Sequence, residues 1–130
     1  MTLEPEKKDV SYQYGRLLAV FEKIERDTYD KDEMREPNAI RMQSVFSRRP
    51  QYASRILWEQ MKKAYYPRLK PGTRTFYDRL IGEIVEQISA CSNGSREEAL
   101  KDTYFIGYYL QRNALYTSQN NKENHEEEEV

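Results

Sequence analysis

Apolar residues recur at helical spacing through most of this chain, and no segment alternates for long between apolar and polar side chains. The spacing predicts helices that begin close to Val10, Pro37, Pro50, Thr73 and Ser95. Proline and glycine residues between these segments end one helix before the next begins. We therefore expect an all-α fold, a compact bundle of about five helices with short connections.

Local signals refine this prediction. Ser11 is expected to cap the first helix, which should extend to Arg26, and Ser95 and Glu98 have the spacing of a capping box at the start of the last helix. The fourth helix is predicted to bury a stripe made of Phe76, Leu80, Ile81, Ile84, Val85 and Ile88.

Three glycines lie inside predicted helices, on or near their inner faces: Gly15, Gly82 and Gly107. A glycine in a helix costs about 1 kcal/mol relative to alanine. Close approach of a neighbouring backbone often accounts for such a residue. We therefore predict a close helix crossing at each of the three positions.

The 130 residues are enough for one domain with a single core. We expect an N-terminal extension over residues 1–9, a helical domain over 10–117 and an acidic, disordered tail over 118–130. The chain has a mean hydropathy of -1.00, and neither a membrane helix nor a secretion signal is apparent. With one cysteine it has no internal disulfide, so a cytoplasmic location is expected.

Positive charge is concentrated in the middle of the chain. Between Arg35 and Arg79 there are eleven lysines and arginines but three acidic residues, so this block carries +8 while the whole chain carries -1. Clustered cations of this kind are typical of surfaces that bind a phosphate backbone, although a solvated helix face gives a similar pattern. The predicted nucleic-acid-binding residues are Arg41, Arg48, Arg49, Arg55, Lys62, Lys63, Arg68, Lys70 and Arg74.

Eleven tyrosines accompany the charges. Tyr52, Tyr65 and Tyr66 lie among the basic residues, where exposed rings would let bases of a single strand stack. Packing of the rings beneath lysine side chains explains the same pattern equally well. Tyr14, Tyr104 and Tyr108 lie on apolar helix faces and are expected in the core.

Nothing in the sequence favours catalysis. The single histidine, His125, lies in the acidic tail, the five glycines form no phosphate-binding loop, and Cys91 continues an apolar stripe as a small buried thiol. Clustered metal ligands, which a nuclease or a deaminase would need, are missing as well. We expect a protein without enzymatic activity, catalytic residues, metal, cofactor or small-molecule substrate.

Several stretches of the chain resemble a known helical domain in the same order. They are Tyr14–Ile24 (YGRLLAVFEKI), Pro37–Ile40, Leu80–Ile84 and Phe105–Arg112 (FIGYYLQR), with Tyr116 and Thr117 just beyond. Over residues 10–117 the chain is similar to the C-terminal region of the large subunit of the type I-C CRISPR Cascade complex. In that family the region is also made as a separate small subunit. Because this chain starts at Met1 just ahead of the likeness, it resembles the free small subunit.

The resemblance implies a function. Small subunits of this family line the complex beside the crRNA and hold target and displaced DNA strands, which stabilises the R-loop. They have no catalytic activity, since a recruited helicase-nuclease cleaves the DNA. The implied partners are crRNA, target DNA as a single strand or R-loop, the backbone and large subunits, and further copies of the chain. Recognition of the backbone without reading bases suits such a complex, because base pairing supplies specificity.

A different function remains open on the residues alone. The chain is also consistent with a purely structural adaptor that binds protein neighbours and no nucleic acid. In that case the acidic residues of the first helix, Glu22, Glu25 and Asp27, would dock on a basic subunit.

Overall fold

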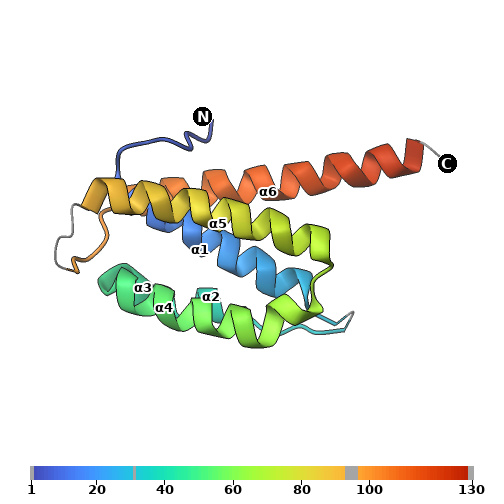
Figure 1. Ribbon diagram of the computed structural model, residues 1–130, viewed down its shortest axis with the longest axis horizontal. Coiled ribbons are helices and arrows are strands. Elements are labelled where there is room, and N and C mark those ends of the chain that lie inside the picture. The colour runs from blue at the N-terminus through green and yellow to red at the C-terminus, as the bar shows by residue number, and fades with distance from the viewer. Residues whose placement is uncertain (1, 31, 93–96, 129–130) are drawn as a thin grey trace.

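The computed structural model describes the backbone of residues 2–30, 32–92 and 97–128, and their side chains except those of 92 and 118–128. Within these ranges the regular elements are all helical, so the predicted all-α fold is confirmed (Figure 1). The elements are α1 (Val10–Asp27), α2 (Asn38–Arg41), α3 (Gln43–Arg48), α4 (Pro50–Gln60), the π-helical turn η1 (Met61–Tyr65), the 3-10 turn η2 (Tyr66–Arg68), α5 (Pro71–Ser92) and α6 (Thr103–Glu128).

Helix α1 is the centre of the bundle. Every residue from Ser11 to Glu25 is buried, because α2, α4, η1, α5 and α6 all pack against this helix. In Figure 1, α1 lies between the long helix α6 and the layer formed by α2, α3 and α4. Apolar residues at helical spacing are typical of a helix with one buried face, but the entire circumference of α1 is covered from Ser11 to Glu25. A polar side chain on α1 must therefore find its partners inside the protein.

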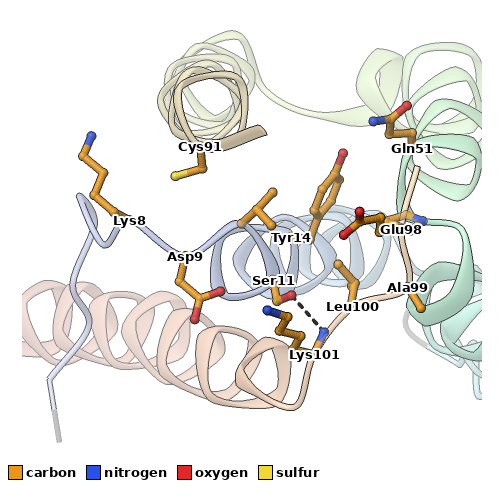
Figure 2. A pocket seen from close by; sticks show the side chains of 12 residues that line it. Lys8, Asp9, Ser11, Tyr14, Gln51, Cys91, Glu98, Ala99, Leu100 and Lys101 are labelled. Atoms are coloured by element: carbon orange, nitrogen blue, oxygen red, sulfur yellow. Dashed lines mark hydrogen bonds between the residues drawn. The ribbon is translucent and has the colours of Figure 1, made fainter. Parts of the chain in front are cut away.

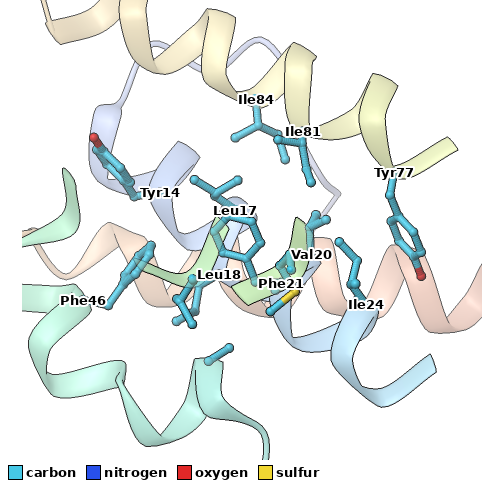
Figure 3. Close-up of a cluster of buried hydrophobic side chains, with 14 of the residues drawn as sticks. Tyr14, Leu17, Leu18, Val20, Phe21, Ile24, Phe46, Tyr77, Ile81 and Ile84 are labelled. Carbon is cyan, nitrogen blue, oxygen red and sulfur yellow. The ribbon is translucent and has the colours of Figure 1, made fainter. Parts of the chain in front are cut away.

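The apolar core surrounds the middle of α1 (Figure 3). Leu17, Phe21 and Ile24 pack within the same cluster as Ile81 and Ile84 of α5. On the other side of α1, the rings of Tyr14 and Phe46 meet edge to face, with centroids 6.0 Å apart. The core therefore joins the layer of α3 and α4 to the rest of the bundle through α1.

Two of the three predicted glycine crossings are present. A Cβ atom on Gly107 of α6 would lie 2.0 Å from the carbonyl oxygen of Tyr12, and one on Gly15 of α1 would lie 2.0 Å from that of Tyr104. The backbones of α1 and α6 are thus in direct contact. The third prediction was wrong, because Gly82 is exposed and has no neighbouring atom within 4 Å of a built Cβ.

The N-terminal caps differ from the prediction. Asp9 caps α1 by accepting a hydrogen bond from the backbone N–H of Tyr12 (3.2 Å). The hydroxyl oxygen of Ser11 instead accepts a hydrogen bond from the N–H of Lys101 (2.9 Å). The last helix was predicted to begin at Ser95, which lies outside the described residues. Residues 97–102 are not helical, and α6 begins at Thr103.

The remaining helices follow the predicted pattern with local changes. The second predicted helix is interrupted at Met42 and forms α2 and α3. In α5 the buried positions are Tyr77, Ile81, Ile84 and Ile88. Phe76 and Val85, which were predicted to be buried, are 52% and 45% exposed. The buried stripe of α5 therefore contains fewer residues than its apolar pattern predicted. Among the described elements, α1 alone packs extensively against α5.

The C-terminal part of α6 extends past the bundle (Figure 1, red end). Its backbone is helical to Glu128, so the helix does not end at the predicted boundary near Ser118. The side chains from residue 118 onward are not described. Disorder of the acidic tail stays a prediction.

Candidate nucleic-acid interface

The acidic side chains of α1 are used inside the protein. Glu22 is 2% exposed and accepts a hydrogen bond from the hydroxyl of Tyr108, with the second carboxylate oxygen 2.9 Å away. The guanidinium groups of Arg26 and Arg112 approach the same carboxylate at 3.8 Å and 3.6 Å. Burial, together with the hydrogen bond to Glu22, raises the pKa of Tyr108. Glu22 thus links α1 to α6 and is not available to a partner.

Glu25 has a similar role on the other side of α1. Its carboxylate is fully buried and accepts hydrogen bonds from Tyr65 Oη (2.6 Å), Arg35 Nη1 (3.0 Å) and the backbone N–H of Asn38 (2.5 Å). Burial and the bond to Glu25 raise the pKa of Tyr65. Arg35 is therefore an internal ion-pair partner, although it belongs to the basic block of the sequence.

These contacts overturn one part of the adaptor hypothesis. Glu22 and Glu25 are enclosed, and Asp27 binds the hydroxyl of Tyr77 and the ammonium of Lys23. The three carboxylates therefore hold α5, α6 and η1 against α1 instead of forming an acidic docking face. The sequence analysis offered them to a partner because helical periodicity does not show that α1 is covered on all sides.

Five predicted contact residues are exposed on the stretch that runs from the end of α3 through α4 to η1, and we call this set of side chains the α4 ridge. Arg48 and Arg49 stand where α3 meets α4, Arg55 lies on α4, and Lys62 and Lys63 lie on η1 directly after it. All five are exposed. The positions that face the core are Pro50, Ala53, Leu57 and Met61. Since Arg55 and Lys62 are seven residues apart, they lie about two helical turns apart on the same face.

Two carboxylates lie beside the α4 ridge. Glu59 forms an exposed ion pair with Lys62 (3.3 Å), and Glu97, from the segment between α5 and α6, lies 3.7 Å from the Nε atom of Arg49. Five cations and two carboxylates leave a net charge of +3. Within the described residues, Arg48, Arg55 and Lys63 have no carboxylate within 4 Å, so the ridge keeps free positive charge.

The other four predicted residues lie away from the ridge. Arg41 is exposed at the end of α2, and Lys70 is exposed just before α5. Arg68 is exposed in η2 but donates to a backbone carbonyl (3.3 Å). Arg74 is half-buried in the first turn of α5 and donates to the carbonyl of the α5-flanking residue Leu69 (3.1 Å). Arg68, Lys70 and Arg74 gather at the connection between η1 and α5, beyond the end of the ridge.

The tyrosines divide clearly. Tyr65 and Tyr66 are 6% and 8% exposed, so of the two interpretations that the sequence left open, base stacking is excluded for both. Tyr52 is 40% exposed, and the guanidinium of Arg49 lies 4.3 Å from the centre of its ring. Tyr14, Tyr104 and Tyr108 are buried, as predicted. Of the three tyrosines among the basic residues, Tyr52 alone is exposed to solvent, beside the α4 ridge.

A hollow of mixed character lies at the end of the bundle near the start of α1 (Figure 2). Tyr14, Cys91, Glu98 and Lys101 contribute to its lining. Cys91 is half-buried with a free thiol, so it is less enclosed than predicted.

Among the described side chains, no group of three or more histidines, cysteines and acids is placed to hold a metal. None of the described helices is long and apolar enough to span a membrane.

Glu97 is the site residue that sequence reasoning did not single out. Its carboxylate accepts a hydrogen bond from the backbone N–H of Tyr52 (2.8 Å) across 45 positions of sequence. No local pattern reports such a distant contact. The nearest signal was the missing side-chain cap at the start of α4, where Arg49 precedes Pro50.

Comparison with known proteins identifies the class of the chain. A family model described as CRISPR-associated protein (Cas_Csd1) matches residues 1–116, and the protein is therefore CRISPR-associated. Because the match covers most of the 130 residues, the chain belongs to the Cas_Csd1 family. No curated protein matches it. The family supports the CRISPR-associated part of the resemblance, while the type I-C subtype and the small-subunit assignment stay predictions.

Proposed function

We propose that this chain is a non-catalytic small subunit of a type I-C CRISPR Cascade complex, and that its α4 ridge binds the backbone of target or displaced DNA to stabilise the R-loop. The observation that carries the proposal is the separation of charge between surface and interior. The carboxylates of Glu22 and Glu25 on α1 are enclosed, whereas the cations of the α4 ridge are exposed. Membership in a CRISPR-associated family supports a nucleic-acid-containing complex as the setting.

The chemistry of the ridge favours backbone contacts over base recognition. Guanidinium groups match phosphate oxygens in two places, and lysine ammonium groups add point charges. Binding of this kind is sequence-independent and weakens with salt, because each contact releases condensed counterions. A guide-RNA complex needs this property, since base pairing with the crRNA supplies specificity.

R-loop formation by the assembled complex tests the proposal. The triple substitution of Arg48, Arg49 and Arg55 with alanine should weaken R-loop formation at physiological salt, because it removes three of the five exposed cations of the α4 ridge. The fold should be retained, since all three side chains are exposed.

A matched control removes the same charge elsewhere. Lys8, Arg79 and Lys101 are also exposed but lie outside α3, α4 and η1. Their triple alanine variant should form R-loops close to the wild-type level. Full R-loop formation by the ridge variant, or an equal loss in both variants, would show that the α4 ridge is not the contact surface.

A protein-binding adaptor without nucleic-acid contact remains the second candidate, and a different surface favours it. Phe105, Ile106 and Tyr109 of α6 are 43%, 40% and 57% exposed. Exposed apolar side chains gathered on one helix are typical of protein contacts. Because Figure 1 shows α6 and α4 on opposite sides of α1, the chain has room for both functions.

A further inference from the structure

Glu97 contacts the α4 ridge at the end where α4 begins. One carboxylate oxygen accepts the backbone N–H of Tyr52 at 2.8 Å, and the other lies 3.7 Å from Arg49 Nε. The first turn of α4 has no side-chain cap of its own, so this distant carboxylate serves an otherwise unpaired N–H group. A carboxylate of the chain therefore lies where the ridge presents both a guanidinium and the positive end of a helix.

We propose that Glu97 is an autoinhibitory contact, an internal anion that competes with nucleic-acid phosphate for Arg49. This inference rests on the proposed function, because it concerns regulation of the same ridge. A carboxylate and a phosphate both carry negative charge on oxygen and bind guanidinium groups in the same way. While Glu97 is in place, it neutralises part of the charge of Arg49, and a phosphate must displace it to gain the full interaction.

The segment that carries Glu97 is held beside the ridge. The backbone N–H of Leu100 donates to the carbonyl of Ser47 (2.7 Å), and that of Lys101 donates to Ser11 Oγ (2.9 Å). Figure 2 shows the Ser11 contact at the base of this segment. Because these hydrogen bonds hold Glu97 beside Arg49, its carboxylate competes for the guanidinium at a high effective concentration. Its effect on the ridge is therefore present at any protein concentration.

The contact is nevertheless weak enough to be displaced. The separation of 3.7 Å between Glu97 and Arg49 is long for a charged hydrogen bond, and the Arg49 side chain is 60% exposed. The guanidinium also lies against the ring of Tyr52, which keeps it near the same place after Glu97 leaves. An incoming phosphate therefore meets a guanidinium that is already positioned.

The substitution Glu97→Gln tests this inference in the full-length chain. The amide oxygen of glutamine still accepts the N–H of Tyr52, so the start of α4 stays capped while the negative charge is lost. The probe is a fluorescently labelled single-stranded oligodeoxynucleotide, and binding is followed by anisotropy over a range of salt concentrations. Exposed ion pairs correspond to factors of about 1.5 to 5 in an equilibrium constant, so affinity should rise by about 2- to 5-fold. The salt slope should steepen by about 0.7, the value for one further phosphate of a single strand.

Two controls separate this effect from a general change in charge. Glu98→Gln removes the same charge from the next residue, which is exposed and forms no ion pair with Arg49 among the described residues. It should change affinity by less than about 1.5-fold and leave the salt slope unchanged. In a chain that already carries Arg49→Ala, the Glu97→Gln substitution should give no gain, because the group that Glu97 opposes has been removed.

The possible failures are distinguishable. If the wild-type chain and all variants fail to bind the oligonucleotide, the proposed function and this inference both fall. If the wild-type chain binds with a normal salt dependence, but Glu97→Gln gives no more than Glu98→Gln or still gains in the Arg49→Ala chain, the autoinhibitory contact is refuted while the proposed function stands.

Discussion

The crossing of α1 and α6 gives a sharp prediction for the substitution Gly107→Ala. The added Cβ would lie 2.0 Å from the carbonyl oxygen of Tyr12, which is backbone and cannot rotate away. An ordinary contact of about 3.5 Å requires the two helices to separate by about 1.5 Å along that direction. Overpacking costs about 1–3 kcal/mol when side chains can adjust. We expect a loss of about 3 kcal/mol or more here, measured as a lower midpoint of urea unfolding.

The same fold supplies a control of opposite sign. Gly82 lies inside α5 at an exposed position with open space around it, so Gly82→Ala should stabilise the protein by about 0.5–1 kcal/mol through helix propensity. Both variants add one methyl group to a helix, and only the surroundings differ. If the free energy of unfolding of Gly107→Ala lies within about 0.5 kcal/mol of the wild-type value, the close backbone contact of α1 and α6 is wrong.

Two further predictions concern the internal polar contacts. Arg35→Ala should lower the free energy of unfolding by about 1–3 kcal/mol, because the fully buried carboxylate of Glu25 loses a charged donor. Arg41→Ala should change it by less than about 0.5 kcal/mol, because Arg41 is exposed. Equal urea midpoints for the two variants would contradict this prediction. Burial raises the pKa of Tyr77 and Tyr108 in the folded state. Above about pH 10 the folded chain therefore keeps hydroxyl protons that the unfolded chain loses. Because of these two groups, the free energy of unfolding should be constant at neutral pH and fall as the pH rises above about 10. Urea midpoints that stay constant up to about pH 11 would count against it.

The helical fold was predictable because its signals are local. The period of apolar residues located the starts of α1, α4 and α5 to within about two residues, and Pro50 marked the start of α4. The start of α5 was predicted at Thr73, and the helix begins at Pro71. Gly15 and Gly107 were correctly predicted at a close crossing. In each case one short stretch of sequence contains the physical cause of the structure.

The environment of each helix was less predictable. The sequence of α1 contains enough charged residues to indicate a solvent face, yet the carboxylates of Glu22 and Glu25 are buried with partners from η1, α6 and the loop before α2. Those partners are as many as 86 positions away in sequence. Conversely, Gly82, Phe76 and Val85 looked internal but face outward, because the long helix α5 is covered extensively by α1 alone.

The candidate site shows the same division. The exposed cations of the α4 ridge could be located from the sequence, because they occupy nearby positions from the end of α3 to η1, and their contact with nucleic acid stays a prediction. The ion pair of Arg35 with the buried carboxylate of Glu25 and the approach of Glu97 to Arg49 depend on tertiary contacts, which clustering cannot report.

Crosslinking of DNA within the assembled complex tests the central claim most directly. The wild-type chain, assembled with the other Cascade subunits and crRNA on a target that forms an R-loop, is irradiated, and the crosslinked peptides are identified by mass spectrometry. We predict adducts in peptides that contain residues 48–63, the segment of the α4 ridge. A complex that forms full R-loops without any adduct in that segment would contradict the account and favour the adaptor.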